Sequence, residues 1–333
     1  MNTKEKNFKN QSSVEKDILP FLSYNIRSIL TQINQNKTDC FEEIRLRAEK
    51  PLMIQGSNID WFVDKDGKLT EKADNPYIVG QEDIVKTLEL MSENSIYAYQ
   101  EEIRSGFITL KGGHRVGICG KAVIEGNYVK NIKDISGMNI RLSKEISGCS
   151  SGIIRFILDS NKSVYNTLIV SPPQCGKTTI LRDIARTISD GTLSFKGLKV
   201  GIVDERSEIA ACYRGIPQNN VGVRTDVLDG CPKTVGMSMM LRSMSPQVMI
   251  TDEIGNQGDK EAVMKVINAG IKIITTAHGY NISELKTRQE VLSLIEEGIF
   301  ERYIVLSRAK GPGTLEEIIE GNSMKMIYGR DTL

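Results

Sequence analysis

Apolar residues in the first half of the chain change their spacing several times, which indicates a mixture of helices and strands. A helix is expected over residues 18–30, where apolar side chains recur at helical spacing: Ile18, Leu22, Ile26, Ile29 and Leu30. Residues 81–91 have the same amphipathic pattern and begin with acidic side chains, as helices often do. Short apolar runs at 51–54, 107–110 and 116–118, with glycine-rich segments near the later ones, predict strands and turns.

The second half of the chain has a more regular pattern, which begins near residue 150. Four apolar runs are typical of buried strands: residues 167–170, 199–204, 248–252 and 271–276. Helical segments separate these runs, and the alternation predicts an α/β domain in which helices cover a mostly parallel sheet. The expected organisation is a flexible polar tail at 1–14, an N-terminal α+β domain at 15–150 and the α/β domain at 151–333.

Composition narrows the class of protein further. Among 333 residues, 43 lysines and arginines nearly balance 42 aspartates and glutamates, so the net charge of +1 does not suggest a nucleic-acid binder. A hydrophobic content of 40% argues against intrinsic disorder. No apolar run approaches the ~18 residues of a membrane span, and the polar N-terminus is unlike a signal peptide. A cytoplasmic protein is therefore expected, and its six cysteines, which form no C-x-x-C pair, indicate no zinc site.

A phosphate-binding loop follows the first strand of the second domain. The run 167–170 leads directly into Ser171-Pro172-Pro173-Gln174-Cys175-Gly176-Lys177-Thr178, and a helical pattern comes next. In this context backbone N–H groups at the start of the helix point at phosphate oxygens, and the helix dipole favours the anion. The residues expected to bind the nucleotide are Gln174, Cys175, Gly176, Lys177, Thr178 and Thr179. Lys177 is expected to reach the β- and γ-phosphates, and the Thr178 hydroxyl to bind Mg²⁺.

Two features of this loop are unusual. Its first position, usually a glycine, is Ser171, and Pro172 and Pro173 have no N–H group to donate. Because the donors needed at the phosphates come from later positions, the prolines remove little and stiffen the turn. Cys175 has two interpretations, either a reactive thiol at a helix N-terminus or a small residue that fits the turn.

A pair of carboxylates ends a later strand, where the run 248–252 reaches Asp252 and Glu253. If this strand neighbours the phosphate-loop strand, both side chains lie at the sheet edge where phosphates bind. Asp252 is then expected to hold Mg²⁺, and Glu253 to orient or deprotonate the attacking water. The alternative is a strand that simply ends in solvated acidic residues, but the phosphate loop favours the catalytic interpretation.

Two further strand ends carry candidate catalytic residues. Asp204, Glu205 and Glu208 form an acidic cluster after one predicted strand, and His278 ends another. Glu205 is expected to assist the positioning of water. A histidine beside the nucleotide would hydrogen-bond the γ-phosphate and sense its loss, whereas the alternative is a purely structural histidine.

The order of these motifs resembles that of the secretion-ATPase superfamily, the hexameric motors of type II and type IV secretion and of pilus assembly. In that comparison Asp204, Glu205 and Glu208 look like its aspartate box, and Ala277 with His278 like its histidine box. Several segments are similar, more specifically, to the stage III sporulation AA family of spore-forming bacteria: residues 113–117, 181–183, 203–210 and 224–233.

The resemblance covers most of the chain from about residue 40 onward. It implies a RecA-like P-loop ATPase domain behind a smaller N-terminal domain, with ATP and Mg²⁺ as cofactors. It also implies a homo-oligomer, a hexameric ring, that serves a secretion-like channel between mother cell and forespore. Such an ATPase would act in the mother-cell cytoplasm, docked on a membrane protein, without a nucleic-acid partner.

Motors of this type place the nucleotide between subunits, so a neighbouring subunit must supply positive charge to the γ-phosphate. An arginine with this role raises the rate of related NTPases by ~10³–10⁵. The preferred candidates are Arg115, Arg141 and Arg224, with Arg206 and Arg242 as further ones. For each of them the alternative is an ordinary surface arginine.

Two other functions remain open from the residues alone. RecA-like cores also build nucleic-acid-stimulated ATPases, but the near-zero charge and an aromatic content of 6% disfavour a surface for stacking bases. The other alternative is a nucleotide-dependent scaffold with negligible hydrolysis, which the pair Asp252 and Glu253 disfavours.

Overall fold

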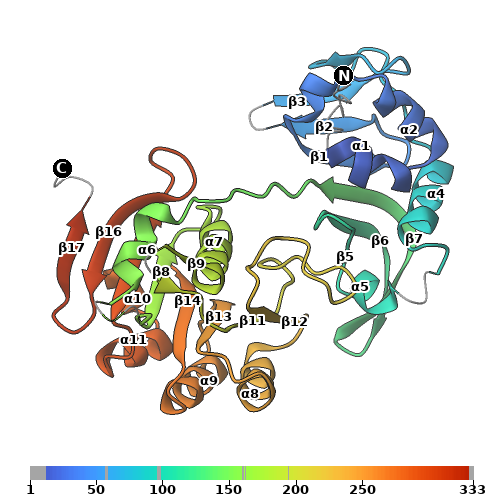
Figure 1. The fold of residues 1–333 in the computed structure, drawn as a ribbon. Helices are drawn as coiled ribbons and strands as arrows, with labels where there is room; N and C mark the ends of the chain where they lie inside the picture. Colours follow the sequence, from blue (N-terminus) through green and yellow to red (C-terminus); the bar gives the residue numbers. More distant parts are fainter. Residues whose placement is uncertain are drawn as a thin grey trace, which may run out of the picture. The chain divides into compact units, whose positions relative to one another are not determined.

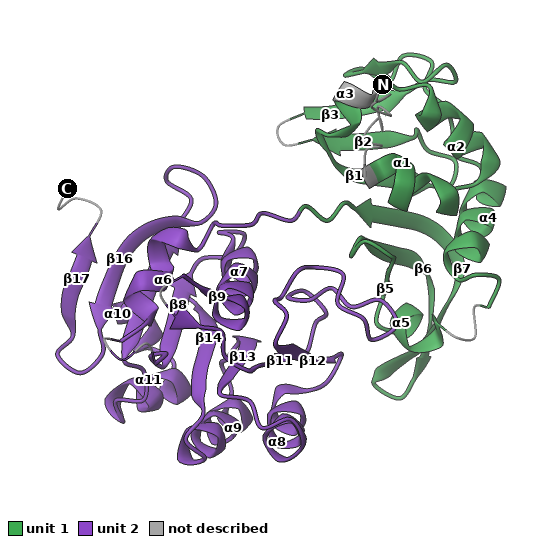
Figure 2. Ribbon diagram, in the orientation of Figure 1, with its two compact units in different colours: residues 1–144 green, residues 145–333 purple. Residues whose placement is uncertain are grey.

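The computed structural model describes residues 13–56, 59–95, 99–159, 161, 163–193 and 195–329. The chain divides into two compact units, residues 1–144 and 145–333 (Figure 2). This division falls shortly before the expected domain boundary at residue 150. Most of the expected flexible tail at 1–14 lies outside the described residues, and its last two positions, Ser13 and Val14, belong to the first helix.

The N-terminal unit combines short helices with an antiparallel sheet. Its helices are α1 (Ser13–Asp17), η1 (Leu19–Phe21), α2 (Tyr24–Thr31), α3 (Gln35–Thr38), α4 (Gln81–Met91) and α5 (Gln100–Arg104). Its strands are β1 (Phe41–Arg47), β2 (Met53–Gly56), β3 (Ile59–Val63), β4 (Leu69–Thr70), β5 (Phe107–Thr109), β6 (Arg115–Glu125) and β7 (Tyr128–Arg141). The strand order is β4-β3-β2-β1-β7-β6-β5, and all neighbours pair antiparallel.

The N-terminal helices confirm one prediction and correct another. Helix α4 has the predicted bounds, whereas the helix expected over 18–30 is interrupted by η1 and restarts at α2. Pro20 lies in η1, and a proline cannot donate the N–H that a continuous helix needs. Ser23 then caps the start of α2, since its hydroxyl accepts a hydrogen bond from the N–H of Ile26.

The C-terminal unit alternates strands with helices (Figure 1). Its helices are α6 (Ser151–Ile157), α7 (Lys177–Asp190), α8 (Lys233–Ser243), α9 (Gln257–Asn268), α10 (Ile282–Leu285) and α11 (Gln289–Glu296). Its strands are β8 (Thr167–Ser171), β9 (Gly191–Thr192), β10 (Phe195–Lys196), β11 (Val200–Asp204), β12 (Thr225–Asp229), β13 (Val248–Glu253), β14 (Lys272–His278), β15 (Arg302–Ser307), β16 (Thr314–Glu320) and β17 (Lys325–Gly329).

The large sheet of this unit is mostly parallel, in the order β12-β11-β13-β14-β8-β15-β16-β17. The strands from β12 to β15 in this order pair in parallel, and the last two join antiparallel. The four predicted strands of this unit are confirmed as β8, β11, β13 and β14. However, β14 lies between β8 and β13, so the strand of Asp252 is one strand further from the phosphate-loop strand than expected.

Alternating side chains of β8 face two separate hydrophobic cores, one on each side of the sheet. Ile169 packs in the core that contains Ile184 of α7. Leu168 and Val170 face the other side, where the core contains Val263 of α9. Because successive residues of a strand point to opposite faces, the continuous apolar run of β8 follows from burial on both sides.

Among the described residues, the structure has no helix whose length and apolar character would let it span a membrane.

Candidate active site

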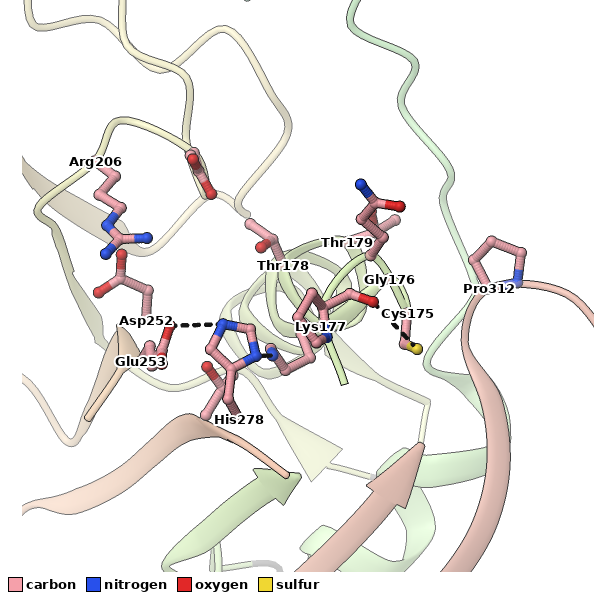
Figure 3. A pocket seen from close by; sticks show the side chains of 14 residues that line it. Cys175, Gly176, Lys177, Thr178, Thr179, Arg206, Asp252, Glu253, His278 and Pro312 are labelled. Carbon is pink, nitrogen blue, oxygen red and sulfur yellow. Dashed lines mark hydrogen bonds and ion pairs between the residues drawn. The ribbon is translucent and has the colours of Figure 1, made fainter. Parts of the chain in front are cut away.

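A cavity of about 380 Å³ lies at the carboxyl edge of the parallel sheet (Figure 3). Its lining combines the phosphate loop with side chains from the last residues of β13 and β14 and from the loops after β11 and β15: Pro173, Gln174, Cys175, Gly176, Lys177, Thr178, Thr179, Arg206, Glu208, Asp252, Glu253, Thr276, His278 and Pro312. All six residues expected to bind the nucleotide therefore line one cavity, together with Asp252, Glu253 and His278. Parallel topology explains this gathering, because the carboxyl ends of parallel strands meet at one sheet edge.

The turn from β8 into α7 depends on a glycine. Gly176 precedes the first residue of α7 and has a φ of 78°, in the left-handed region that favours glycine. A Cβ atom at this position would lie 3.2 Å from the backbone N of Gly313. The same N–H of Gly313 donates to the carbonyl oxygen of Cys175 at 2.9 Å, so the loop after β15 packs directly on the phosphate loop.

Pro312 lines the cavity through this contact and was missing from the predicted site. The sequence Gly311-Pro312-Gly313 predicts a loop at this point, but it does not indicate that this loop packs on the phosphate loop.

The side chain of Lys177 contacts both the phosphate loop and β14. Its Nζ atom donates to the carbonyl oxygen of Ser171 at 3.0 Å and lies 2.5 Å from Nδ1 of His278. Burial lowers the pKa of Lys177 to about 8, although the negative charge of Glu253 acts in the opposite direction. The ammonium thus occupies an environment that a bound anion would make more favourable.

His278 connects Lys177 with Glu253. Its Nε2 atom lies 2.9 Å from Oε2 of Glu253, and Figure 3 shows the ring between the two side chains. Because an ammonium only donates, Nδ1 is assigned as the acceptor and Nε2–H as the donor to the carboxylate. A neutral imidazole therefore orients the carboxylate expected to act on water, and β14 supplies it from its place between β8 and β13.

Asp252 lies beside a lysine that was absent from the predicted site. Lys233, at the start of α8, is buried, and its Nζ lies 2.5 Å from Oε2 of Glu205 and 3.5 Å from Oδ1 of Asp252. Burial raises the pKa of Asp252 to about 6, while the charge of Lys233 opposes this rise. Glu205 is paired with Lys233 and is not among the residues that line the cavity. The sequence offered no signal beyond a lysine at the start of a helix.

The three acidic residues at the end of β11 and in the loop after it lie in different surroundings. Asp204 is fully buried, and its carboxylate accepts the N–H groups of Glu208, Ile209 and Ala210. Burial raises the pKa of Asp204, and these hydrogen bonds act against the rise. Asp204 therefore shapes the loop after β11, whereas Glu208 lines the cavity.

Cys175 is 3% exposed, and its Sγ lies 3.6 Å from the carbonyl oxygen of Pro173. This burial favours a small residue that fits the turn over a reactive thiol. Alkylation of Cys175 would consequently require the loop to open.

Two of the three preferred arginines lie in the N-terminal unit. Arg115 is on β6, with its guanidinium carbon 3.6 Å from the ring centroid of Phe107. Arg141 ends β7 and donates from Nε to the Glu43 carboxylate at 2.9 Å. Neither is among the residues that line the cavity.

The three candidate arginines of the C-terminal unit lie in three different places. Arg224 donates to the carbonyl oxygens of Ser189 and Asp190, at the end of α7 that is remote from the phosphate loop. A helix of this length puts it about 20 Å from the loop within the same subunit. Arg206 lines the cavity, and Arg242 lies in a groove with Lys265. Of the five candidates, Arg206, one of the two less preferred, is thus the one that lines the cavity with the phosphate loop.

The polar side chains of the cavity fit a nucleoside triphosphate together with a divalent cation such as Mg²⁺. The Thr178 hydroxyl and the Asp252 carboxylate offer the oxygen ligands that Mg²⁺ prefers, and Lys177 offers a positive charge to phosphate oxygens. Gly176 has no side chain, so backbone atoms are accessible at the start of α7. A phosphate-binding loop needs such backbone N–H groups to contact the phosphates.

The fold is similar to that of two solved proteins, an ATPase and a pilus retraction motor. The ATPase DotB from Yersinia pseudotuberculosis superposes with a TM-score of 0.56 at 12% identity, over 91% of this chain and 81% of its own. The pilus retraction motor PilT with bound ADP gives a TM-score of 0.51 at 14% identity, over 81% of this chain and 76% of its own. At these identities the similarity concerns the fold, a RecA-like P-loop ATPase fold.

Sequence comparison defines the family. Stage III sporulation protein AA from Bacillus subtilis (strain 168) is 40% identical over 318 residues, which are 95% of this chain and 99% of that protein. The family described as "Sporulation stage III, protein AA" matches residues 12–326. Both matches agree with the resemblance seen in the segments 113–117, 181–183, 203–210 and 224–233. The chain therefore belongs to the sporulation stage III protein AA family.

Proposed function

We propose that the protein is a Mg²⁺-dependent ATPase that powers or assembles a secretion-like channel between mother cell and forespore. The observation that carries the proposal is the line of contacts from Lys177 through His278 to Glu253 in one cavity. It places a phosphate-binding cation and a candidate base on opposite sides of one imidazole. A site that only bound nucleotide would have no need of an oriented carboxylate.

In the proposed reaction each side chain has a separate task. The water oxygen attacks the γ-phosphorus, the bond to the β-phosphate oxygen breaks, and ADP and phosphate leave. Lys177 neutralises phosphate charge, and Glu253, held by His278, orients the water and accepts its proton. Thr178 and Asp252 would hold Mg²⁺, which supplies charge stabilisation at the phosphates when bound.

The proposal includes a homo-oligomeric ring, a hexamer, in which a neighbouring subunit completes the site. Arg115, Arg141 and Arg224 are the candidates for action across the interface, because their positions leave them outside the cavity of their own subunit. Glu205 would act through its ion pair with Lys233, next to Asp252. The similarity of the fold to DotB and PilT supports a motor-like arrangement.

The site of action is proposed to be the mother-cell cytoplasm, at the membrane through a membrane-protein partner, without nucleic acid. The sporulation role follows from the family and from the name of the Bacillus subtilis relative. The near balance of charge, 43 basic against 42 acidic residues, supports a protein partner over nucleic acid.

Glu253→Gln tests the proposal by separating binding from hydrolysis. The variant keeps the size of the side chain but removes its negative charge, so ATP binding should persist while turnover falls by about 10²–10⁴-fold. The matched control is Glu261→Gln, which changes an exposed carboxylate of α9. Equal turnover in wild type and Glu253→Gln would contradict the assigned role.

Size-resolved chromatography with and without ATP and Mg²⁺ tests the motor arrangement. The wild type should assemble with ATP, Glu253→Gln should trap the assembly, and Lys177→Ala should prevent it. A chain that stays monomeric in all three cases would instead be a nucleotide-dependent scaffold. Turnover that rises with added nucleic acid and falls with salt would indicate a nucleic-acid motor.

A further inference from the structure

Arg182 connects the phosphate-loop helix to the loop that follows β11. It lies on α7, the helix that begins with Lys177. Its Nε atom donates to the carbonyl oxygen of Ile209 at 2.6 Å, and its Nη2 atom donates to that of Glu208 at 2.8 Å. The fork of the guanidinium thus holds two successive backbone groups of one loop.

The same loop is held from its other side by Asp204. The carboxylate accepts the N–H groups of Glu208 at 2.9 Å, Ile209 at 3.0 Å and Ala210 at 2.8 Å. Asp204 and Arg182 therefore satisfy both the N–H and the carbonyl groups of Glu208 and Ile209. A backbone segment with both kinds of group occupied has little freedom to change its path.

The loop after β11 carries two of the side chains that line the nucleotide cavity, Glu208 within the held segment and Arg206 two residues before it. In Figure 3, Arg206 and Asp252 lie on the side of the cavity opposite Pro312. Lys177 and Arg182 belong to one rigid helix, so the path of the loop is tied to the position of the phosphate loop. A shift of α7 upon phosphate binding would move both sides of the cavity together.

We infer that Arg182 is a positioning residue for the proposed hydrolysis, an inference that rests on the proposed function. By holding the carbonyl groups of Glu208 and Ile209, it keeps Arg206 and Glu208 directed at the nucleotide. It acts through the loop and not on the nucleotide, because it is not among the residues that line the cavity.

The experiment compares three variants of the full-length chain. Arg182→Gln removes the charged fork, and Arg182→Lys restores one charged donor. Arg186→Gln is the matched control, because Arg186 lies on the same helix but pairs with Asp183 instead of the loop. For each variant we would measure amide hydrogen exchange of residues 205–210, ATP affinity, and kcat and KM for ATP.

The expected result for Arg182→Gln is faster exchange at Glu208 and Ile209, unchanged ATP affinity and a kcat lowered by about 10–100-fold. Arg182→Lys should recover part of kcat, and Arg186→Gln should retain it. In a Glu208→Gln background the Arg182→Gln change should lower kcat by a smaller factor than in the wild type, since the contribution of Glu208 is already lost and only that of Arg206 remains to be disturbed.

Several outcomes would overturn the inference. Unchanged exchange in 205–210 would show that Arg182 does not hold the loop, and unchanged kcat would show that the loop does not position the site. A parallel loss of ATP affinity would indicate damage to the phosphate loop instead. If the wild type itself hydrolysed no ATP, the proposed function would fail first and the inference with it.

Discussion

The Nε2 atom of His278 lies 2.9 Å from Oε2 of Glu253, so a histidine at the end of β14 orients a carboxylate at the end of β13. The other ring nitrogen faces the ammonium of Lys177 at 2.5 Å. Because β14 separates β13 from β8, the histidine bridges a gap that Glu253 and Lys177 do not close themselves. In the proposed function, His278 therefore links the side chain that binds phosphate, Lys177, to the carboxylate of Glu253.

His278→Ala should lower kcat by about 10–100-fold, because Glu253 loses the donor that fixes its direction. ATP binding should change far less, since Lys177 and the backbone of the phosphate loop remain. Phosphate release and equilibrium binding of a fluorescent ATP analogue would separate the two effects. Tyr280→Ala, at a position 71% exposed and two residues further on, serves as the control. A His278→Ala variant with wild-type kcat would show that the ring is only structural.

The affinity for ATP should fall as the pH rises through about 8. Burial lowers the pKa of Lys177 to about 8, so the nucleotide-free protein loses this proton at mildly alkaline pH. Bound phosphate favours the charged ammonium, so binding above this pH must take up a proton. The dissociation constant should then rise by up to about tenfold per pH unit, and level off below the pKa. Titration at several pH values checks this, and a constant affinity across the range would contradict it.

Asp183→Asn should destabilise the C-terminal unit by about 2 kcal/mol. The carboxylate accepts the N–H groups of Gly148 and Ser150, the Ser150 hydroxyl and the Arg186 guanidinium. Burial alone would raise the pKa of Asp183, but these hydrogen bonds lower it to about 2 from an ordinary 3.8.

The pH dependence of this contribution has a definite sign. Because the folded protein has the lower pKa, the contribution is present above about pH 4 and is lost as the pH falls toward 2. Urea unfolding of wild type and Asp183→Asn measures it, with Asp226→Asn on the exposed part of β12 as the control. Equal stability of the wild type and Asp183→Asn at neutral pH would contradict the expectation.

The gathering of most candidate site residues in one cavity could be predicted, because each of them stands in a local sequence pattern. The phosphate loop, Asp252, Glu253 and His278 all stand at the ends of apolar runs, and parallel strands bring such ends together. Helix α4 was predicted with its bounds, since its amphipathic pattern and acidic first turn agree. The continuous apolar runs of β8, β11, β13 and β14 reflect burial on both faces.

Other features depend on contacts that the sequence does not display. The predicted strands omit β12, whose residues Thr225–Asp229 mix polar and apolar side chains at the sheet edge. They also omit β15, although Tyr303–Leu306 carries the same apolar signal as the predicted strands. Lys233 and Pro312 reach the site or its neighbours from distant segments, which only the tertiary fold reveals. The position of Arg224 at the far end of α7 likewise depends on a tertiary contact that the sequence does not reveal.

Gly176→Ala should abolish ATP binding while most of the fold persists. The φ of 78° is unfavourable for alanine, and its Cβ would press on the backbone N of Gly313. The control is Gly152→Ala in α6, where an added Cβ meets nothing within 4 Å and should stabilise the helix by about 0.5–1 kcal/mol. Binding of a fluorescent ATP analogue and thermal unfolding report the two effects. Wild-type affinity in Gly176→Ala would contradict the described path of the phosphate loop.

The most direct test of the central claim is steady-state phosphate release from ATP by the wild type and Lys177→Ala, each with Mg²⁺ and with EDTA. Turnover is expected only in the wild type with Mg²⁺, because the cation and Lys177 together neutralise the charge at the phosphates. Turnover in Lys177→Ala that matched the wild type, or that persisted in EDTA, would show that the cavity at the carboxyl edge of the sheet is not where ATP is hydrolysed.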